Sequence, residues 1–205
     1  MTKKMERKLP RSFFARPALE VARDIVGRRL VHVTEEGTVA GIVVEAEAYT
    51  GLDDPASHAY GGRQTKRNEV MWGPPGFAYV YPIYGMYLCF NVVCGKVGEP
   101  QGTFLRAIRP TEGQALMAVR RGFPVWGEKI ERQLGNGPSK LCQAFGITRS
   151  LNGADACGED LYFTTGNDPG DVVAAKRIGI DYAGPGREWP WRFLIKGDPF
   201  VSKSP

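Results

Sequence analysis

The sequence of 205 residues has few of the features that mark metal sites, membrane spans or secreted proteins. Its four cysteines, Cys89, Cys94, Cys142 and Cys157, lack the paired Cys-X-X-Cys spacing of a zinc site, and its two histidines lie far from them in sequence. This spacing predicts no metal site. No segment approaches the length of an apolar membrane span, and the charged start is not followed by an apolar signal sequence. The sequence therefore predicts a protein of a reducing, cytoplasmic setting with free thiols.

The chain also lacks a Pro- or Ser-rich linker, a low-complexity tract and an internal repeat. This predicts one domain with a substantial core over residues 13–205. The charged residues 1–12 are expected to be a flexible basic tail, which adds non-specific affinity for nucleic acid at most. With 27 Lys and Arg against 22 Asp and Glu, the net charge of +5 attracts polyanions but does not identify one.

What the sequence does have is a run of aromatic residues over 77–91. Two aromatic-rich strands meet there at Pro-Ile-Tyr-Gly, residues 82–85, which predicts a hairpin with Tyr84 near its tip. An aromatic side chain at a tip needs either a core to bury into or a partner to insert into. Minor-groove proteins push such wedges between base pairs, at a cost of roughly a few kcal/mol per step. DNA is therefore the leading candidate partner of this basic chain.

The pattern of apolar residues and turn signals predicts more strands than helices. Helices are expected over 17–26, from a capping box at 111–114 to residue 121, and over 139–145. Besides the hairpin, strands are expected over 28–33, 39–49, 103–108, 161–165, 176–180 and 192–195. Because strands and helices do not alternate regularly, the fold class predicted is α+β, with a mostly antiparallel curved sheet, flanking helices and a protruding hairpin.

Two carboxylates and a phenol occupy one face of the strand predicted over 39–49. Because successive side chains in a strand alternate, Glu45, Glu47 and Tyr49 point to the same side. A solvated face of an antiparallel strand would show the same pattern, so alternation alone does not distinguish a functional carboxylate from an exposed one. The segment that follows favours the functional interpretation.

A long loop, 51–76, follows this strand, and loops of such length inside a compact domain are usually functional. It contains His58 and, after it, three basic residues, Arg63, Lys66 and Arg67. His58 could close a pocket over Tyr49, although a lone loop histidine is more often solvated. The basic residues fit phosphate contacts or a surface cluster equally well. The other histidine, His32, lies in an alternating strand and is assigned no role.

The hairpin carries several tyrosines and one amide: Tyr79, Tyr81, Tyr84, Tyr87 and Asn91. Aromatic rings can stack on a planar base, and an amide can read its edge through hydrogen bonds. The alternative is a hydrophobic core, to which Phe77, Leu88 and Phe90 are expected to belong. Because each buried tyrosine hydroxyl needs a partner, so many tyrosines favour an aromatic pocket.

Five segments carry a more specific pattern. They are Val-Glu-Ala-Glu-Ala-Tyr at 44–49, Ser-His-Ala-Tyr-Gly-Gly-Arg-Gln-Thr-Lys-Arg-Asn at 57–68, Tyr-Val-Tyr-Pro-Ile-Tyr-Gly-Met-Tyr at 79–87, Leu-Arg-Ala-Ile-Arg-Pro at 105–110 and Gly-Pro-Ser-Lys-Leu-Cys-Gln at 137–143. In their order and spacing, over nearly the whole chain, they resemble the alkyladenine (3-methyladenine) DNA glycosylase family. The resemblance implies a single α+β domain that presents its hairpin to the minor groove of double-stranded DNA and excises damaged purines in base excision repair.

The resemblance also implies roles for single residues. Glu47 would activate the attacking water, Arg106 would hold that water or the nucleotide's phosphate, and Tyr84 would fill the gap left by the flipped nucleotide. The base would be sandwiched by Tyr49 and Tyr81, enclosed by His58 and selected by Asn91. Contacts to DNA phosphates are expected from Arg63, Thr65, Lys66, Arg67 and Lys140.

A water nucleophile, in place of a lysine Schiff base, implies a monofunctional enzyme without cofactor or metal that hydrolyses the N-glycosidic bond and leaves an abasic site. We expect a monomer without membrane contact, in the cytoplasm of a bacterium or the nucleus of a eukaryote. The alternative is a non-catalytic nucleic-acid-binding module that uses the same hairpin and loop, in which Glu45 and Glu47 have no task. The preferred lesion stays open among 3-methyladenine, 7-methylguanine, hypoxanthine and ethenoadenine.

Overall fold

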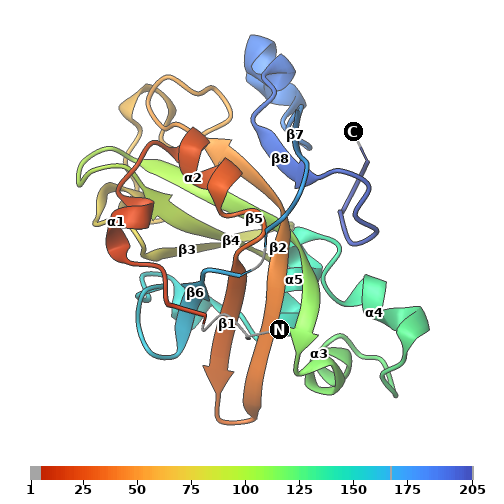
Figure 1. Ribbon diagram of the computed structural model, residues 1–205. Helices are drawn as coiled ribbons and strands as arrows, with labels where there is room; N and C mark the ends of the chain where they lie inside the picture. Colours follow the sequence, from red (N-terminus) through yellow and green to blue (C-terminus); the bar gives the residue numbers. More distant parts are fainter. Residues whose placement is uncertain (1–5, 167, 205) are drawn as a thin grey trace.

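The computed structural model describes residues 6–166 and 168–204, which form an eight-stranded curved sheet with short helices around it (Figure 1). Every strand pairing is antiparallel. In spatial order the main path is β3 (Ala78–Ile83), β4 (Tyr87–Cys94), β5 (Gln101–Glu112), β2 (Gly37–Tyr49), β1 (Arg29–Thr34) and β6 (Leu161–Thr164). Off this path, β8 (Arg192–Ile195) pairs with both β2 and β7 (Val172–Ala175). The α+β prediction with an antiparallel sheet is confirmed.

Within the described part of the chain, five short α-helices surround the sheet: α1 (Arg11–Phe14), α2 (Ala18–Asp24), α3 (Gln114–Arg120), α4 (Glu128–Leu134) and α5 (Pro138–Phe145). The helix predicted over 17–26 is α2, which packs on β2 and β5, and the one predicted over 139–145 is α5, which packs on β4 and β5. Figure 1 shows α3 and α4 beside α5, at the lower right. No helix within the described ranges is long and apolar enough to cross a membrane.

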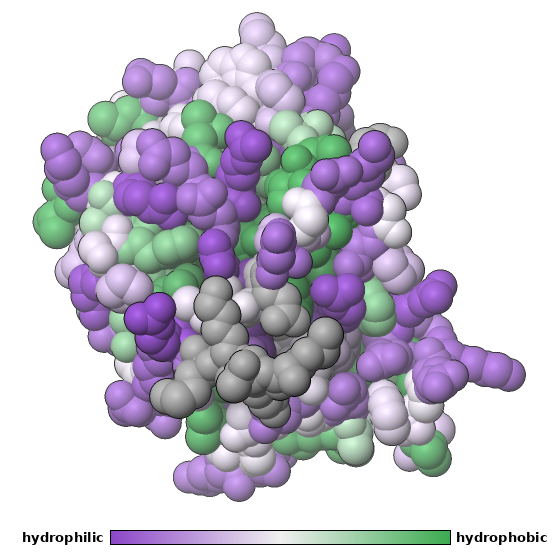
Figure 2. Space-filling model, viewed as in Figure 1, coloured by the Kyte–Doolittle hydropathy of each residue, from purple (hydrophilic) through white to green (hydrophobic). Residues whose placement is uncertain are grey.

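The central strand β2 positions the predicted carboxylates. Its residues from Val39 to Ala48 are all buried, because β1, β5 and β8 flank it and α2 packs against it. Hydrophilic side chains dominate the surface seen in Figure 2, whereas Glu45 and Glu47 are each 0% exposed. The solvated-face alternative is therefore wrong, and the two carboxylates lie inside the protein.

The strand predicted over 176–180 is wrong. The observed strand, β7, ends before this range, because its pairing with β8 stops at Ala175, the partner of Arg192. Beyond this point the backbone bonds to side chains: the Lys176 carbonyl accepts from Arg192 Nε at 2.8 Å, and the Ile178 N–H donates to Glu47 Oε1 at 2.9 Å. The non-strand segment thus brings a donor to one of the predicted site residues.

The capping box predicted at 111–114 is also wrong. Strand β5 continues to Glu112, which pairs with Ala40 of β2, so the backbone there is extended. Gly113 then turns the chain with a left-handed φ of 73° and is the N-cap of α3, without a side-chain cap. A Cβ at this position would lie 2.4 Å from the Thr38 carbonyl oxygen, which explains why a glycine is needed.

The flexible tail expected over residues 1–12 includes residues that make defined contacts with the rest of the protein. Leu9 is buried and its N–H donates to the Phe163 carbonyl at 2.8 Å, which joins the segment to β6. Arg11 lies in α1, which was not predicted, and its Nη2 pairs with Asp155 Oδ2 at 2.7 Å. Helix α4 was not predicted either. Residues 1–5 of the expected tail lie outside the described residues.

Candidate active site

A cavity of about 490 Å³ opens between the hairpin, the end of β2 and the segment that follows β7. Most of the residues singled out from the sequence line it: Tyr49, His58, Arg67, Tyr81, Tyr84, Asn91 and Arg106. They come from β2, the loop 51–76, both strands of the hairpin and β5. The predicted aromatic pocket is therefore present, and segments far apart in sequence build it.

Glu47 lies directly beneath this cavity rather than in its wall. Its Oε2 accepts a hydrogen bond from the Tyr49 hydroxyl at 3.0 Å, and Arg106 Nη1 lies 3.3 Å from its Oε1. The Ile178 N–H donates to the same carboxylate. The cavity above Glu47 is lined by Tyr49, Arg106 and Ile178. Burial raises the pKa of Glu47 above its ordinary value of 4.5, although Arg106 acts in the opposite direction. The site thus contains a desolvated carboxylate of increased basicity.

His58 is part of the aromatic wall and is not a solvated loop residue. Its Nδ1 is 2.8 Å from the Tyr79 hydroxyl, and its ring packs edge-on against Tyr81 with the centroids 4.6 Å apart. Burial, followed by the nearby charges of Arg67 and Arg63, lowers the pKa of His58 to about 4. The imidazole is therefore neutral at pH 7 and can stack or exchange hydrogen bonds without adding a charge.

Asn91 and Tyr81 extend the wall along the hairpin. Asn91 stands opposite Tyr79 in the register of β3 and β4, and its Nδ2 donates to the Tyr79 carbonyl at 3.3 Å. Tyr81 packs beside Tyr79, with ring centroids 5.1 Å apart. Asn91 is 5% exposed and lines the cavity.

The hairpin tip carries Tyr84 out of the protein. This side chain is 89% exposed, and its neighbour Met86 is 75% exposed. Tyr84 is the one non-glycine residue with positive φ, 48°, among those described, so the turn itself sets its direction. An exposed aromatic in a specialised backbone conformation, at the mouth of a cavity, suits insertion into a partner.

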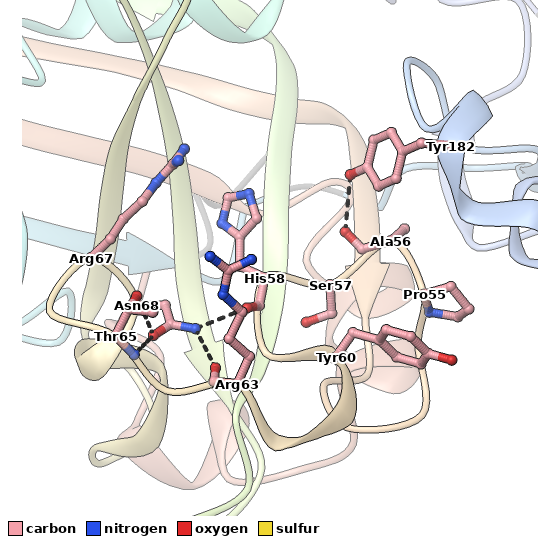
Figure 3. A pocket seen from close by; sticks show the side chains of 10 residues that line it. All are labelled: Pro55, Ala56, Ser57, His58, Tyr60, Arg63, Thr65, Arg67, Asn68 and Tyr182. Atoms are coloured by element: carbon pink, nitrogen blue, oxygen red, sulfur yellow. Dashed lines mark hydrogen bonds between the residues drawn. The ribbon is translucent and has the colours of Figure 1, made fainter.

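The basic loop lines a second cavity of about 410 Å³ (Figure 3). The residues that it shares with the first cavity are Ala56, Ser57, His58, Arg67 and Tyr182. Asn68, which was not singled out from the sequence, holds this loop. Its Nδ2 donates to the carbonyls of His58 and Arg63 at 2.9 and 2.8 Å, and its Oδ1 accepts from the Thr65 N–H at 2.7 Å.

The predicted phosphate contacts differ in their surroundings. Arg63, Thr65 and Lys66 are exposed on this loop, and Arg63 and Thr65 line the second cavity. Arg67 is tied to the hairpin, because its Nη2 donates to the Pro82 carbonyl at 3.1 Å and its guanidinium lies 5.1 Å from the Tyr81 ring. Lys140 lies on α5, where its Nζ donates to Asn136 Oδ1 at 2.9 Å.

A buried ion pair behind Tyr49 was missed in the sequence. Arg177 and Asp54 are both 0% exposed in their side chains and bond through Nη1 to Oδ2 at 2.6 Å and Nη2 to Oδ1 at 2.8 Å. The Arg177 guanidinium lies 4.7 Å from the Tyr49 ring centroid and also donates to the Ala48 carbonyl. No local pattern reveals a pair separated by 123 residues.

Removing one partner of this pair should destabilise the fold strongly. In Asp54→Ala, the Arg177 guanidinium stays buried without its carboxylate, and we expect a loss of about 3–5 kcal/mol in the free energy of unfolding. Urea unfolding measures this loss. The exposed neighbour provides the control, since Asp53→Ala should change stability by less than about 0.5 kcal/mol. Equal effects of the two variants would contradict the importance of the pair.

The cysteines are free: Cys89, Cys94 and Cys142 are buried and Cys157 is half-buried. Across residues 6–166 and 168–204, no group of three or more His, Cys, Asp or Glu side chains is arranged to hold a metal ion. Burial raises the pKa of Cys89, which lines the first cavity, to about 11, so its thiol is neutral at pH 7.

Comparison with known proteins relates this site to one family. A family model described as methylpurine-DNA glycosylase matches residues 12–199. A protein from Desulfitobacterium hafniense (strain Y51) is 46% identical over 200 residues, covering 96% of this chain and 98% of the relative. One from Methanocella arvoryzae is 48% identical over 196 residues, covering 95% and 96%. One from Clostridium acetobutylicum is 46% identical over 199 residues, covering 95% and 97%. All three are provisionally named as 3-methyladenine DNA glycosylases.

Proposed function

The chain belongs to the methylpurine-DNA glycosylase family, and from this premise we propose that it flips damaged purines out of duplex DNA and hydrolyses their N-glycosidic bond with a water activated by Glu47. It is a DNA N-glycosylase of the 3-methyladenine type, acting in DNA repair. The observation that carries the proposal is the buried Glu47 carboxylate beneath an aromatic cavity whose mouth bears the exposed Tyr84.

Flipping requires that lost base stacking be replaced. In our proposal Tyr84 enters the gap in the duplex, while the extruded purine stacks between Tyr49 and Tyr81, with His58 at its edge. Stacking on an aromatic side chain stabilises a base by roughly 1–3 kcal/mol, comparable to the few kcal/mol that extrusion costs. Lesions that pair poorly are therefore favoured. Asn91 faces the purine edge and restricts which purines fit.

Hydrolysis places positive charge on the sugar, so the site needs a carboxylate that accepts a proton from water and stabilises this charge. Glu47 supplies it, and the water reaches the carboxylate between Tyr49, Arg106 and Ile178, the three residues that cover it. Arg106 orients this water or the adjacent phosphate. The water's oxygen bonds to the sugar carbon, its proton passes to Glu47, and the purine departs with the bonding electrons.

The leaving base sets how much acid help is needed. An N-alkylated purine is already cationic and departs readily, whereas neutral hypoxanthine or ethenoadenine requires protonation or hydrogen bonds. His58 is neutral at pH 7 because its pKa is lowered to about 4, and burial raises the pKa of Tyr79 to about 12. Neither side chain is suited to protonate a leaving purine, so alkylated bases should be excised fastest.

The duplex is held through its phosphates in this proposal. Contacts come from Arg63, Thr65 and Arg67, which line the cavities, from Lys66 on the same loop, and from Lys140 on the helix that borders the first cavity. The enzyme acts as a monomer, wherever its DNA is held: the cytoplasm of a bacterium or the nucleus of a eukaryote. Among the described residues, no lysine lines the first cavity, which supports attack by water and an intact strand with an abasic site as the product.

Release of free base tests the activity. Incubation with methylated duplex DNA should release 3-methyladenine and 7-methylguanine, identified by mass spectrometry, and borohydride should trap no covalent complex. Undamaged duplex provides the control and should release nothing. Folded protein that binds DNA but releases no base from methylated, hypoxanthine or ethenoadenine duplexes would support the binding-module alternative instead.

The pH dependence of the excision rate should report the ionisation of the Glu47 carboxyl group. Only the carboxylate form accepts a proton, and burial raises its pKa, so the excision rate should fall as the pH drops through a value above 4.5. We would measure single-turnover excision of 7-methylguanine from pH 4.5 to 6.5, because this lesion is cationic over that range. A rate that stays constant over this range would contradict a carboxylate base of raised pKa.

A further inference from the structure

Glu45, two residues before Glu47, is fully buried and takes no direct part in the proposed hydrolysis. Its Oε1 accepts from Arg106 Nε at 3.1 Å and from Arg192 Nη1 at 2.9 Å, and its Oε2 accepts from the Ser202 N–H at 2.6 Å. It does not line the cavity. A carboxylate with three donors from three parts of the chain is held rigidly in place.

Arg106 is divided between the two carboxylates. Its Nε bonds to Glu45, whereas its Nη1 is only within ion-pair distance of Glu47, at 3.3 Å, and its Nη2 is 3.5 Å from Ser202 Oγ. A guanidinium can hold a carboxylate with two parallel hydrogen bonds, which is its strongest arrangement. In this protein the two-bond arrangement with Glu47 does not form, because Glu45 and Ser202 engage the other nitrogens.

We propose that Glu45 is a positioning residue of the glycosylase site: it anchors Arg106 and so prevents this arginine from closing a two-bond ion pair on Glu47. The inference rests on the proposed function, because a free Glu47 matters only if it accepts a proton. Arg192 neutralises Glu45 and is itself fixed by the carbonyls of Lys176 and Lys203. The C-terminal segment thus helps to build the site, although it lies outside the cavity.

The consequence for Glu47 is its basicity. Arg106 lowers the pKa of Glu47 and the charge of Glu45 raises it, both against the larger effect of burial. The other ionisable groups that interact electrostatically with Glu47 come from the elements packed round it, namely Tyr49, Tyr81, Cys89, Arg177 and Tyr182. Loss of Glu45 would lower the pKa of Glu47 by two effects, because it removes a negative charge and also frees Arg106 to pair with Glu47.

The experiment is the pH profile of single-turnover 7-methylguanine excision for the parent and Glu45→Gln. The acid limb of the profile is the pH range in which the excision rate falls as the pH drops. In the variant this acid limb should move down by at least about 1 pH unit, and the excision rate at pH 7 should fall about tenfold. A Glu45→Gln/Arg106→Met double variant removes the competing cation and should move the acid limb back up. The control is Glu36→Gln, an exposed glutamate that also pairs with an arginine, which should leave the profile unchanged.

Each outcome decides between a positioning role and a merely structural one. If Glu45 only supported the fold, Glu45→Gln would lower the amount of active enzyme but leave the acid limb at the parent's pH, and this result would overturn the proposal. Failure of the double variant to move the limb up would do the same. If the parent itself released no base, the proposed function would fail instead.

A measurement on the parent keeps the proposal testable should Glu45→Gln not fold. The Arg106 Nε–H bonds to a buried carboxylate, so in an NMR experiment its proton should exchange with solvent far more slowly than that of the exposed Arg132. Exchange at similar rates would show that Glu45 does not anchor Arg106, and would overturn the proposal.

Discussion

Glu47→Gln is expected to lower the single-turnover excision rate on the order of 10²–10⁴-fold while lesion-containing duplex DNA is still bound. Glutamine has the same size and can still accept the Ile178 N–H, so the cavity keeps its shape. It cannot take a proton from water, and it brings no negative charge to the developing sugar cation. Excision near the parent rate would contradict the assignment of Glu47 as the base.

The matched control for this variant is an exposed glutamate. Glu128 is exposed at the start of α4 and does not line the first cavity, and Glu128→Gln makes the same chemical change on the surface. We expect its excision rate and its stability to equal those of the parent. Fluorescence anisotropy with a labelled duplex separates binding from chemistry, because Glu47→Gln should lose only the chemical step.

Tyr84→Asn is expected to give the second largest loss. Removing the wedge forfeits stacking of roughly 1–3 kcal/mol, which corresponds to about a 5- to 150-fold loss in excision efficiency. Asparagine is the appropriate replacement because it tolerates the positive φ of 48° at this position better than most residues. The loss should appear for paired lesions in duplex DNA and shrink for the same lesion in a single strand, where no gap needs filling.

Tyr84→Phe is the control for the wedge. It keeps the ring and removes only the hydroxyl, which is exposed at the hairpin tip, so excision from duplex DNA should stay close to the parent's. Stopped-flow fluorescence of a reporter base beside the lesion follows the flipping step directly. If Tyr84→Asn flipped and excised as fast as the parent, insertion of this residue would play no part in catalysis.

Local patterns in the sequence predicted the parts of the site that depend on short-range geometry. The alternation in β2 placed Glu45, Glu47 and Tyr49 on one side, and the two aromatic strands around Tyr84 predicted the hairpin. Both depend only on the period of a strand and on turn residues. The family resemblance connected these residues with the loop that carries His58, and Tyr49, His58 and Tyr84 line one cavity.

The rest depends on contacts between distant segments. Nothing local pairs Asp54 with Arg177 or Glu45 with Arg192, and the donor to Glu47 comes from a segment wrongly predicted as a strand. The capping box failed for a related reason, since pairing of β5 with β2 overrides the helix signal after Thr111. Tertiary pairing prevails over local propensity in each case.

The central claim is that Glu47 activates the water that releases the damaged purine. The most direct test is single-turnover excision from a labelled duplex with one 7-methylguanine, for the parent and Glu47→Gln, each treated afterwards with and without an endonuclease specific for abasic sites. We predict breaks that require this endonuclease with the parent and are lost in a Glu47→Gln protein that still binds the duplex. Endonuclease-dependent breaks of equal rate in both proteins, or breaks that need no endonuclease, would contradict it.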